Sequence, residues 1–396
     1  MQTQENIVAL SPAKPIDVRR LEKELTVMWA GTIAPAEQGG ATAMGITRAC
    51  VLNLIVYASQ LEGRESIDAM LDEVIGRHPC RALVLLIDRE AAQAKLEAYV
   101  STRCQLSSKG AKQICGEQVT IEASGQVVQT VATAVAPLLI PDVPVFLWWK
   151  DIPNRDDVLF KRLVAMADRV IIDSACFDHP YDDFLHLAAM LREQPQTMHV
   201  SDLNWGRLRT WRTLIASFWD VADYRPFLDH LDRVVVTYEK SKSSHDTLML
   251  RALLIVGWVA AQLGYEVETS TRAEVDGGDT RFTLRAGERM VSVEVRAVDA
   301  QPAIDPMMIS ILLSVANGDA EFNVELKPER TKLVTGVKIG DSEHSIGRVL
   351  TYEARSEGQR LSSELDFLTR DVIYEKAVAL SARLIETTQI ASSGSQ

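Results

Sequence analysis

The sequence predicts an α/β N-terminal domain with a Rossmann-like, mainly parallel sheet, followed by an α+β C-terminal domain with an antiparallel meander. Two observations favour this. From about residue 46 to residue 192, apolar strand-like runs alternate with helical periodicity, the pattern of crossover units on a parallel sheet. Beyond about residue 235, short alternating runs separated by turns are typical of antiparallel strands. A chain of 396 residues is expected to hold two or three domains.

The first 40 residues are expected to form an extended arm, because prolines and glycines interrupt them. Apolar residues at helical spacing between residues 18 and 28 indicate a short helix inside this arm. The predicted domains are therefore the arm at 1–40, the Rossmann-like domain at 41–235 and the α+β domain at 236–396.

The first strand of the N-terminal domain is expected at residues 50–57, where the run CVLNLIVY is typical of a strand covered on both faces. Apolar residues at helical spacing and a candidate N-cap, Ser66, predict the helix that follows. The same reasoning predicts strands at 82–87, 115–123, 143–149 and 169–173, and helices at 67–75, 127–138, 156–167 and 181–192.

One more strand is expected at 234–238, across the domain boundary near 235, and a long apolar helix follows at 246–263. The most apolar part of that helix is about ten residues long, about half of what a bilayer requires, so we expect a buried core helix. Asp276-Gly277-Gly278 predicts a hairpin. The remaining segments are strands at 265–273, 280–286, 289–298, 308–315, 321–327, 333–339 and 344–350, and helices at 361–368 and 372–385.

Charge and composition exclude several classes of protein. The chain has 42 basic and 54 acidic residues, a net charge of -12, which argues against a non-specific nucleic-acid binder and against docking to anionic lipid. The N-terminus lacks a basic start followed by an apolar core, so no signal peptide is expected. We expect a cytoplasmic protein that binds neither nucleic acid nor membrane.

Sequence motifs predict no catalytic residue, metal or cofactor. GxxxxGK[ST], GxGxxG after a strand and GxSxG do not occur. Cys80 with His78 is a conceivable thiol and base, but Cys80 is better explained as a small apolar residue entering a strand. Cys176 and His179 lack a second pair spaced to complete a tetrahedral zinc site. The five cysteines stand at positions 50, 80, 104, 115 and 176 with no CxxC, so reduced thiols are expected.

Polar residues follow the predicted strands of the first domain, at the edge where α/β folds bind ligands. These candidate crevice residues are Asp88, Lys150, Asp151, Asp173 and Ser174. One interpretation is a small metabolite-binding crevice, in an enzyme or in a binding protein. The other is that strand ends emerge into solvent and are polar for that reason. Both stay open.

The most distinctive segment spans residues 201–220. Its aromatic and aliphatic residues fall on one stripe at helical spacing, and Arg207 and Arg212 flank this stripe. One interpretation is an amphipathic core helix with Trp205 and Trp211 buried. The other is a helix edge that presents tryptophan and arginine to a partner, since both types are enriched in interface hot spots. The candidate partner-binding residues are Trp205, Arg207, Trp211 and Arg212.

Three runs together resemble the glucose-6-phosphate dehydrogenase assembly protein family, OpcA. They are HPCRALVLLID at 78–88, IPDVPVFLWWKDIP at 140–153 and, above all, DLNWGRLRTWR at 202–212. The order and spacing of these runs also resemble that family, from about residue 40 to about residue 385.

The resemblance implies a non-catalytic partner of glucose-6-phosphate dehydrogenase, the entry enzyme of the oxidative pentose phosphate pathway. It implies that the protein promotes assembly of the active oligomer and raises its activity. In photosynthetic members the pair is tied to redox control through thioredoxin. Redox sensing needs two cysteines able to meet within about 7 Å. No cysteine lies beyond residue 176, so the second half cannot supply such a pair, and several of the five lie in predicted strands as core residues. We therefore expect the dehydrogenase to carry any redox control.

Overall fold

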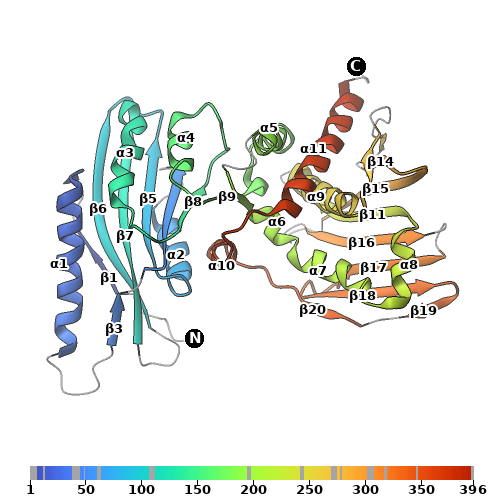
Figure 1. Cartoon of the computed structure of the whole chain (residues 1–396), viewed down its shortest axis with the longest axis horizontal. Coiled ribbons are helices and arrows are strands. Elements are labelled where there is room, and N and C mark those ends of the chain that lie inside the picture. The colour runs from blue at the N-terminus through green and yellow to red at the C-terminus, as the bar shows by residue number, and fades with distance from the viewer. Residues whose placement is uncertain are drawn as a thin grey trace. The chain divides into compact units, whose positions relative to one another are not determined.

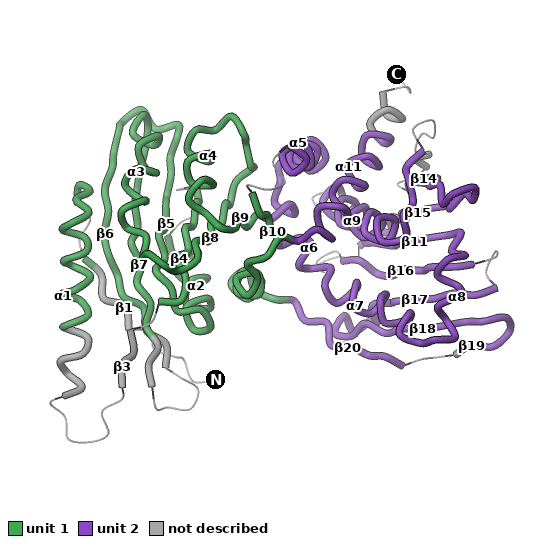
Figure 2. The backbone as a smooth tube through the Cα atoms, viewed as in Figure 1, with its two compact units in different colours: residues 1–172, 195–201, 355–370 green, residues 173–194, 202–354, 371–396 purple. Residues whose placement is uncertain are grey.

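The computed structural model describes most of the chain. The described residues are 7–11, 14–37, 45–48, 50–59, 64–106, 112–193, 198–240, 245–268, 274–276, 279–300, 307–315, 319–344 and 347–393. The chain forms two compact units, and neither is a continuous stretch of sequence (Figure 2). Unit 1 comprises Met1–Ile172, Pro195–Ser201 and Arg355–Arg370. Unit 2 comprises Asp173–Gln194, Asp202–Ala354 and Asp371–Gln396.

The described part of unit 1 contains a mostly parallel sheet with the strand order β1-β6-β7-β5-β4-β8-β9-β10. Strands β7, β5, β4, β8 and β9 run parallel, whereas β6 joins β7 and β1 in antiparallel pairs. The short β2 pairs with β6, and β3 pairs with β7. Their bounds are β1 Ile7–Leu10, β2 Lys14–Pro15, β3 Gly45–Arg48, β4 Leu52–Ser59, β5 Cys80–Asp88, β6 Lys95–Leu106, β7 Lys112–Ser124, β8 Val145–Trp149, β9 Arg169–Ile172 and β10 Val200–Asp202.

The helices of unit 1 follow local sequence signals. α2 buries every apolar residue that repeats at helical spacing, from Ile67 to Ile75. At α4, the Asp157 side chain accepts the backbone N–H groups of Leu159 and Phe160 as an N-cap. The bounds are α1 Val18–Glu37, α2 Arg64–Ile75, α3 Val131–Val135, α4 Val158–Val164 and α10 Glu357–Glu364. The helix expected at 127–138 is interrupted, since 3-10 turns η2 Gly125–Thr130 and η3 Ala136–Leu138 flank α3.

Helix α10 lies far along the chain but packs on α2. A capping box formed by Ser356 and Gln359 begins it. A Cβ atom added to Gly358 would lie 2.9 Å from the carbonyl oxygen of Met70, so glycine is required for this close approach. His78 Nε2 lies 2.8 Å from the carbonyl oxygen of Ser362. These contacts complete unit 1.

The N-terminal segment differs from the expected extended arm. β1 pairs with β6, and the 20-residue α1 lies beside β6 (Figure 1). Leu21 and Leu25 of α1 are buried. The Trp29 indole N–H donates to Glu117 at 2.7 Å, and Glu22 pairs with Arg81 at 2.6 Å. The apolar periodicity from residue 18 onward was thus the stronger signal, and the prolines do not prevent this segment from joining the sheet unit.

The described part of unit 2 contains a largely antiparallel sheet with the order β12-β14-β15-β11-β16-β17-β18-β19. The expected hairpin is present, with Asp276 paired to Asp279. The expected meander is interrupted, because β11 lies between β15, to which it is parallel, and β16. The bounds are β11 Leu231–Lys240, β12 Glu266–Val267, β13 Glu274–Asp276, β14 Asp279–Ala286, β15 Arg289–Asp299, β16 Met308–Val315, β17 Ala320–Leu326, β18 Lys332–Ile339, β19 Ser342–His344 and β20 Val349–Thr351.

Helices of unit 2 pack on one face of this sheet, α9 against β11 and β15, and α7 against β17. By length and composition alone α9 could cross a membrane, but Leu250, Leu253 and Leu254 are fully buried, as expected of a core helix. The bounds are η4 Ser174–Cys176, α5 Pro180–Glu193, α6 Leu203–Arg207, α7 Arg209–Phe218, η5 Ala222–Tyr224, α8 Arg225–Leu228, α9 His245–Leu263 and α11 Val372–Ser393.

The domain boundary expected near residue 235 differs from the one in the structure. The chain first enters unit 2 at Asp173 and enters it again at Asp202. The pattern does change near 235, but β11 lies inside the second sheet rather than at the end of the first. Helices α6, α7 and α8, which precede β11, therefore belong to unit 2 as well.

Candidate functional site

Three of the five predicted crevice residues lie in unit 1, and each interacts with neighbours in that unit. Asp88 Oδ1 accepts the backbone N–H groups of Glu90 and Ala91 at 3.1 and 3.0 Å and closes the turn after β5. Asp151 Oδ1 accepts the N–H of Ile152 at 2.7 Å. Both carboxylates thus stabilise the loops that leave the strands.

Lys150 follows β8 and is nearly buried, with 10% of its side chain exposed. Its Nζ lies 2.9 Å from Glu357 Oε2 and 4.4 Å from the centroid of the Trp148 ring. The carboxylate and the aromatic face both stabilise the charged Lys150 ammonium group in this position. We infer that Lys150 joins the loop after β8 to the start of α10.

An aromatic stack occupies the carboxyl ends of β4 and β8. The rings of Tyr57 and Trp149 stack with their centroids 3.7 Å apart, and Phe160 meets Trp149 edge-on at 4.9 Å. Arg89 Nε donates to the Tyr57 hydroxyl at 2.9 Å and also pairs with Asp157. Burial raises the pKa of Tyr57, so the phenol stays protonated near neutral pH. Side chains therefore fill the part of this edge nearest Lys150.

The other two predicted crevice residues, Asp173 and Ser174, lie in unit 2. Each has its own partners there, described below. The structure thus divides the five residues between two units, and metabolite binding by them stays a prediction. In the described part of the chain, no group of three or more His, Cys, Asp or Glu side chains is arranged to hold a metal ion.

The DLNW block, residues 202–212, centres on a buried carboxylate. Asp202 is 1% exposed and accepts four hydrogen bonds. Its Oδ1 accepts the backbone N–H groups of Ser174 and Asn204 at 2.9 and 2.8 Å. Its Oδ2 accepts the Ser174 and Tyr374 hydroxyls at 2.6 and 3.1 Å. Asp202 thus caps α6 and joins it to η4 and to the start of α11.

The electrostatics of this cluster follow from its burial. Burial raises the pKa of Asp202 to about 6, and the nearby negative charge of Asp173 adds to this, whereas the hydrogen bonds from Ser174 and Asn204 oppose it. Burial also raises the pKa of Tyr374 well above its usual range, so its hydroxyl keeps the proton that it donates.

Arg207 forms a bidentate ion pair with Asp173. Its Nη1 and Nη2 lie 2.7 and 2.8 Å from the two carboxylate oxygens, and 17% of the arginine side chain is exposed. Asp173 Oδ1 also accepts the N–H of Ala175 at 3.1 Å. A paired, hydrogen-bonded geometry of this kind compensates the desolvation of both charges.

The two tryptophans of the block point into unit 2. Trp205 is 4% exposed and donates its indole N–H to Asp371 at 3.0 Å. The guanidinium of Arg212 lies 3.5 Å from the centroid of the Trp205 ring. Trp211 is 1% exposed and meets Tyr352 edge-on. Of the two interpretations of this segment, burial supports the amphipathic core helix, although the helix breaks at Leu208 into α6 and α7.

The four candidate partner-binding residues are therefore brought together, but as a packed and paired cluster. Trp205 and Trp211 do not present their rings to solvent. Sequence reasoning missed Asp371 and Tyr374, which lie 166 and 172 residues from their partners. It also missed Arg251, whose Nε donates to Asn204 Oδ1 at 2.8 Å. A role of the block in partner binding stays a prediction, with these side chains shaping the surface rather than forming it.

The cysteines correct an expectation. Reduced thiols were expected, but Cys104 on β6 and Cys115 on β7 form a disulfide. They are direct cross-strand neighbours, and both are buried beside Trp29. β6 was not among the predicted strands, so the register that joins the two cysteines was not apparent. Cys80 is fully buried and its thiol pKa is raised by burial, which disfavours the reactive thiolate.

Comparison with known protein families gives two matches that together span most of the chain. Residues 71–189 match the family model described as the glucose-6-phosphate dehydrogenase subunit N-terminal domain, OpcA_G6PD_assem. Residues 198–378 match the corresponding C-terminal domain model, OpcA_G6PD_C. The two matches follow one another in the order that the names imply.

Curated relatives are named putative OxPP cycle protein OpcA. The relative from Synechococcus elongatus is 30% identical over 341 residues, covering 82% of this chain and 72% of its own length. The relative from Nostoc punctiforme is 28% identical over 323 residues, covering 80% and 67%.

Solved structures show weaker similarity. A putative oxidoreductase from Parabacteroides merdae has a TM-score of 0.48 and 10% identity, covering 88% of this chain and 100% of its own. Myo-inositol dehydrogenase from Lactobacillus casei has a TM-score of 0.47 and 10% identity, covering 87% and 96%. Neither similarity bears on activity.

Proposed function

Because the chain belongs to the OpcA family of glucose-6-phosphate dehydrogenase assembly proteins, we propose that it is a non-catalytic assembly factor and allosteric activator of that enzyme. In this proposal it acts in the cytoplasm, in the oxidative pentose phosphate pathway. It binds the dehydrogenase and favours the active oligomer.

The observation that carries the proposal is the match of both family domains in order, over residues 71–189 and 198–378. The side chains add support. The most distinctive polar groups, those around Asp202 and Asp173, are tied to one another by hydrogen bonds and ion pairs inside unit 2. Such a cluster is suited to holding a surface in shape.

Activation needs a difference in affinity between two states of the enzyme. The protein must bind the active state more tightly than the inactive state, because equal affinity shifts nothing. A difference of about 1–3 kcal/mol would raise activity roughly 5–150-fold.

We place the contact surface on the solvent side of α7. The buried side of this helix carries Trp211 and Ile215, whereas Thr213 and Ala216 are exposed. The Arg212 guanidinium lies over the Trp205 ring and so holds α7 against α6, and the Arg207–Asp173 pair ties the end of α6 to the start of η4.

The first test is enzyme kinetics. Glucose-6-phosphate dehydrogenase from the same organism is assayed over a range of glucose-6-phosphate concentrations, with and without this protein, and the mixtures are run on size-exclusion chromatography with light scattering. We expect a co-eluting complex and a lower KM or a higher kcat. Absence of both, under reducing and oxidising conditions, would refute the proposal. Co-elution without any kinetic change would indicate a scaffold that binds the dehydrogenase without activating it.

The second test addresses the surface. Ala216→Arg places a long cation on the exposed side of α7 and leaves the buried cluster intact, so we expect a folded protein that activates at least tenfold more weakly. The matched control is Ala92→Arg, at an exposed alanine of unit 1. Equal activation by both variants would show that the contact surface lies elsewhere on the protein. It would leave the proposed activation of the dehydrogenase unaffected.

A third measurement addresses the crevice around Lys150, Asp151 and Asp173. Sugar phosphates and nucleotides are screened by thermal shift with this protein alone. We expect no saturable rise in the unfolding temperature, because Lys150 is already paired with Glu357 and Asp173 with Arg207. A saturable shift from one ligand, with no effect on the dehydrogenase, would favour a metabolite-binding protein or an enzyme.

A further inference from the structure

The sheet of unit 2 has a second face that carries polar side chains. Successive side chains of a strand point to opposite faces, and directly paired residues of neighbouring strands share a face. The registers therefore define three rows that cross the sheet from β14 to β18. Row 1 is Thr283, Ser292, Arg233, Ser314, Glu321 and Lys338; row 2 is Arg281, Glu294, Val235, Leu312, Asn323 and Gly336; row 3 is Arg296, Thr237, Ser310, Glu325 and Val334, beginning at β15.

The charges on this face, which we call the row face, are unevenly distributed. On the β14–β15–β11 side, Arg233, Arg281 and Arg296 all pair with the single carboxylate Glu294. Their side chains are 45, 45 and 42% exposed, so a surplus of positive charge faces outward. On the other side, β17 carries Glu321 and Glu325, and the Glu325 side chain is 42% exposed. Two lysines accompany these glutamates: the exposed Lys338 lies beside Glu321 in row 1, and Lys327 lies 3.4 Å from Glu325.

The registers place these opposite charges symmetrically about a line between β11 and β16. Arg296 and Glu325 both lie in row 3, each on the second strand from that line. Ser292 and Glu321 have the same relation in row 1. Val235 and Leu312 have it in row 2, one strand from the line. A two-fold rotation about an axis parallel to these strands keeps each row and exchanges the two sides.

A second copy placed by this rotation would therefore meet complementary groups. Arg296 faces the partner's Glu325, and Leu312 faces the partner's Val235. The other two-fold axis in the plane runs perpendicular to the strands, along row 2. It would place each strand on its own copy and exchange rows 1 and 3, so that Glu321 would face the partner's Glu325 and Arg281 would face the partner's Arg281. Charge complementarity thus selects one symmetry operator.

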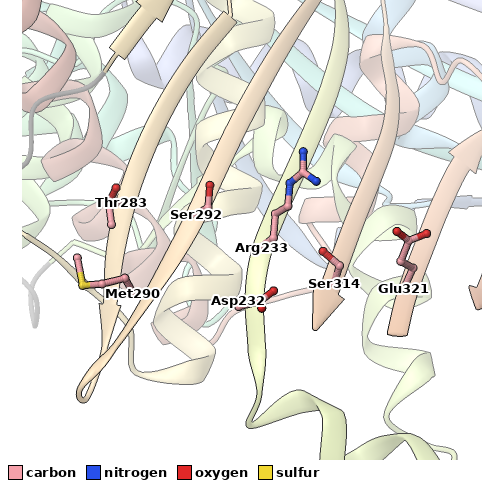
Figure 3. A pocket seen from close by; sticks show the side chains of 7 residues that line it. All are labelled: Asp232, Arg233, Thr283, Met290, Ser292, Ser314 and Glu321. Carbon is pink, nitrogen blue, oxygen red and sulfur yellow. The ribbon is translucent and has the colours of Figure 1, made fainter. Parts of the chain in front are cut away.

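A depression on the row face fits the same arrangement. It has a volume of about 510 Å³ and lies between Met290 and Glu321 (Figure 3). Its other lining residues are Thr283, Ser292, Ser314, Arg233 and Asp232. The rotation brings the partner's Glu321 above Ser292, next to Thr283 and Arg233. Two hydroxyls and a guanidinium are suitable donors for that carboxylate.

The area is that of a weak dimer. Six strands about 4.8 Å apart and three rows about 6.8 Å apart cover about 29 by 20 Å. Two such faces would bury about 1,200 Å², which is the lower limit of standard specific interfaces. The arginine and glutamate side chains are long enough to bridge sheets stacked about 10 Å apart.

We propose that the row face of unit 2 binds a second copy of this chain through a two-fold axis parallel to β11 and β16, with Arg296 paired to the partner's Glu325. The dimer is isologous, so this contact occurs twice. The proposal does not depend on the proposed function, because its test contains no dehydrogenase.

The experiment measures molecular mass by sedimentation velocity over a range of protein concentrations. The full chain is expected to pass from monomer to dimer. Arg296→Glu and Glu325→Arg each replace two attractive contacts with two repulsive ones, so each is expected to raise the dimer dissociation constant at least tenfold. The double variant keeps the net charge and is expected to dimerise like the natural chain. Lys161→Glu, at an exposed site of unit 1, is the control for the charge change.

Mixing the two single variants gives the sharpest outcome. Each variant alone is expected to be monomeric, whereas a one-to-one mixture forms a heterodimer with two correct pairs. Circular dichroism checks that both are folded. The Glu325 side chain is 42% exposed, and its ion pair with Lys327 at 3.4 Å is local, so Glu325→Arg keeps the test valid if Arg296→Glu misfolds. A natural chain that stays monomeric, a dimer insensitive to both substitutions, or a mixture that fails to associate would each overturn the proposal.

Discussion

Asp202 provides a sharp test of how the buried cluster stabilises unit 2. The proposed change is Asp202→Asn, which keeps the size of the side chain and removes its charge. The amide oxygen can accept the two backbone N–H groups of Ser174 and Asn204. The amide nitrogen can donate to the Ser174 and Tyr374 hydroxyls, since a hydroxyl can accept as well as donate.

The size of the effect follows from the pKa. A rise from the ordinary value of 3.8 to about 6 means that the folded state binds the Asp202 proton more tightly than the unfolded chain does. The stabilisation from that proton is complete below pH 3.8 and is lost as the pH rises through 6, a total of about 3 kcal/mol. About 2 kcal/mol of this falls between pH 4.5 and pH 7.5.

The measurement is the free energy of unfolding by urea for both proteins at several pH values. The difference between them cancels the titration of every other carboxylate. Relative to the natural chain, the Asp202→Asn protein is expected to gain about 2 kcal/mol of stability from pH 4.5 to pH 7.5. Hydrogen exchange of the α6 amides gives a local measure of the same effect. A difference that is constant with pH would show that Asp202 does not titrate as described.

The control variant is Asp202→Ala. It leaves the two backbone N–H groups without their acceptor and removes the cap of α6. We expect it to cost at least about 2 kcal/mol at every pH. If alanine were tolerated as well as asparagine, the hydrogen bonds of the cluster would not be what holds α6 in place.

Two further predictions concern packing and the disulfide. Gly257→Ala places a Cβ 2.3 Å from Ser381 Oγ where α9 meets α11, so this variant is expected to lower the free energy of unfolding by about 1–3 kcal/mol. The control is Gly336→Ala, which has nothing within 4 Å of the added Cβ and is expected to be neutral. Urea unfolding measures both variants. Reduction of Cys104–Cys115 opens a short loop and is expected to cost up to about 3 kcal/mol, a loss that a Cys104→Ala/Cys115→Ala protein does not show on adding reductant.

The sequence predicted the strands of both sheets where apolar runs are continuous. The run at 50–57 became β4, Leu52–Ser59, because a parallel strand covered on both faces consists of apolar residues. β6 escaped prediction for the opposite reason. It buries Arg103, whose charge is paired with Asp68 and Asp72, and a buried ion pair interrupts the apolar pattern that identifies a strand.

The candidate site was predicted in part. The DLNW block is distinctive because tryptophan and arginine recur at helical spacing, and this much is local. Its partners are not local. Tyr374 and Asp371 reach it from the start of α11, and nothing in the spacing of residues 202–212 points to them. Whether the tryptophans face inward or outward was likewise decided by tertiary packing, and they face inward.

The interleaving of the two units bears on how the protein is made. The chain passes from one unit to the other five times, last at residues 370 and 371. α10 supplies Gly358 and Ser362 to unit 1 and emerges only after most of unit 2 has been synthesised. Unit 1 therefore cannot finish folding on the ribosome before the rest of the chain follows. A gene truncated between the two family domains, near residue 195, would encode the sheet of unit 1 without α10. It would also encode α5 without the rest of unit 2.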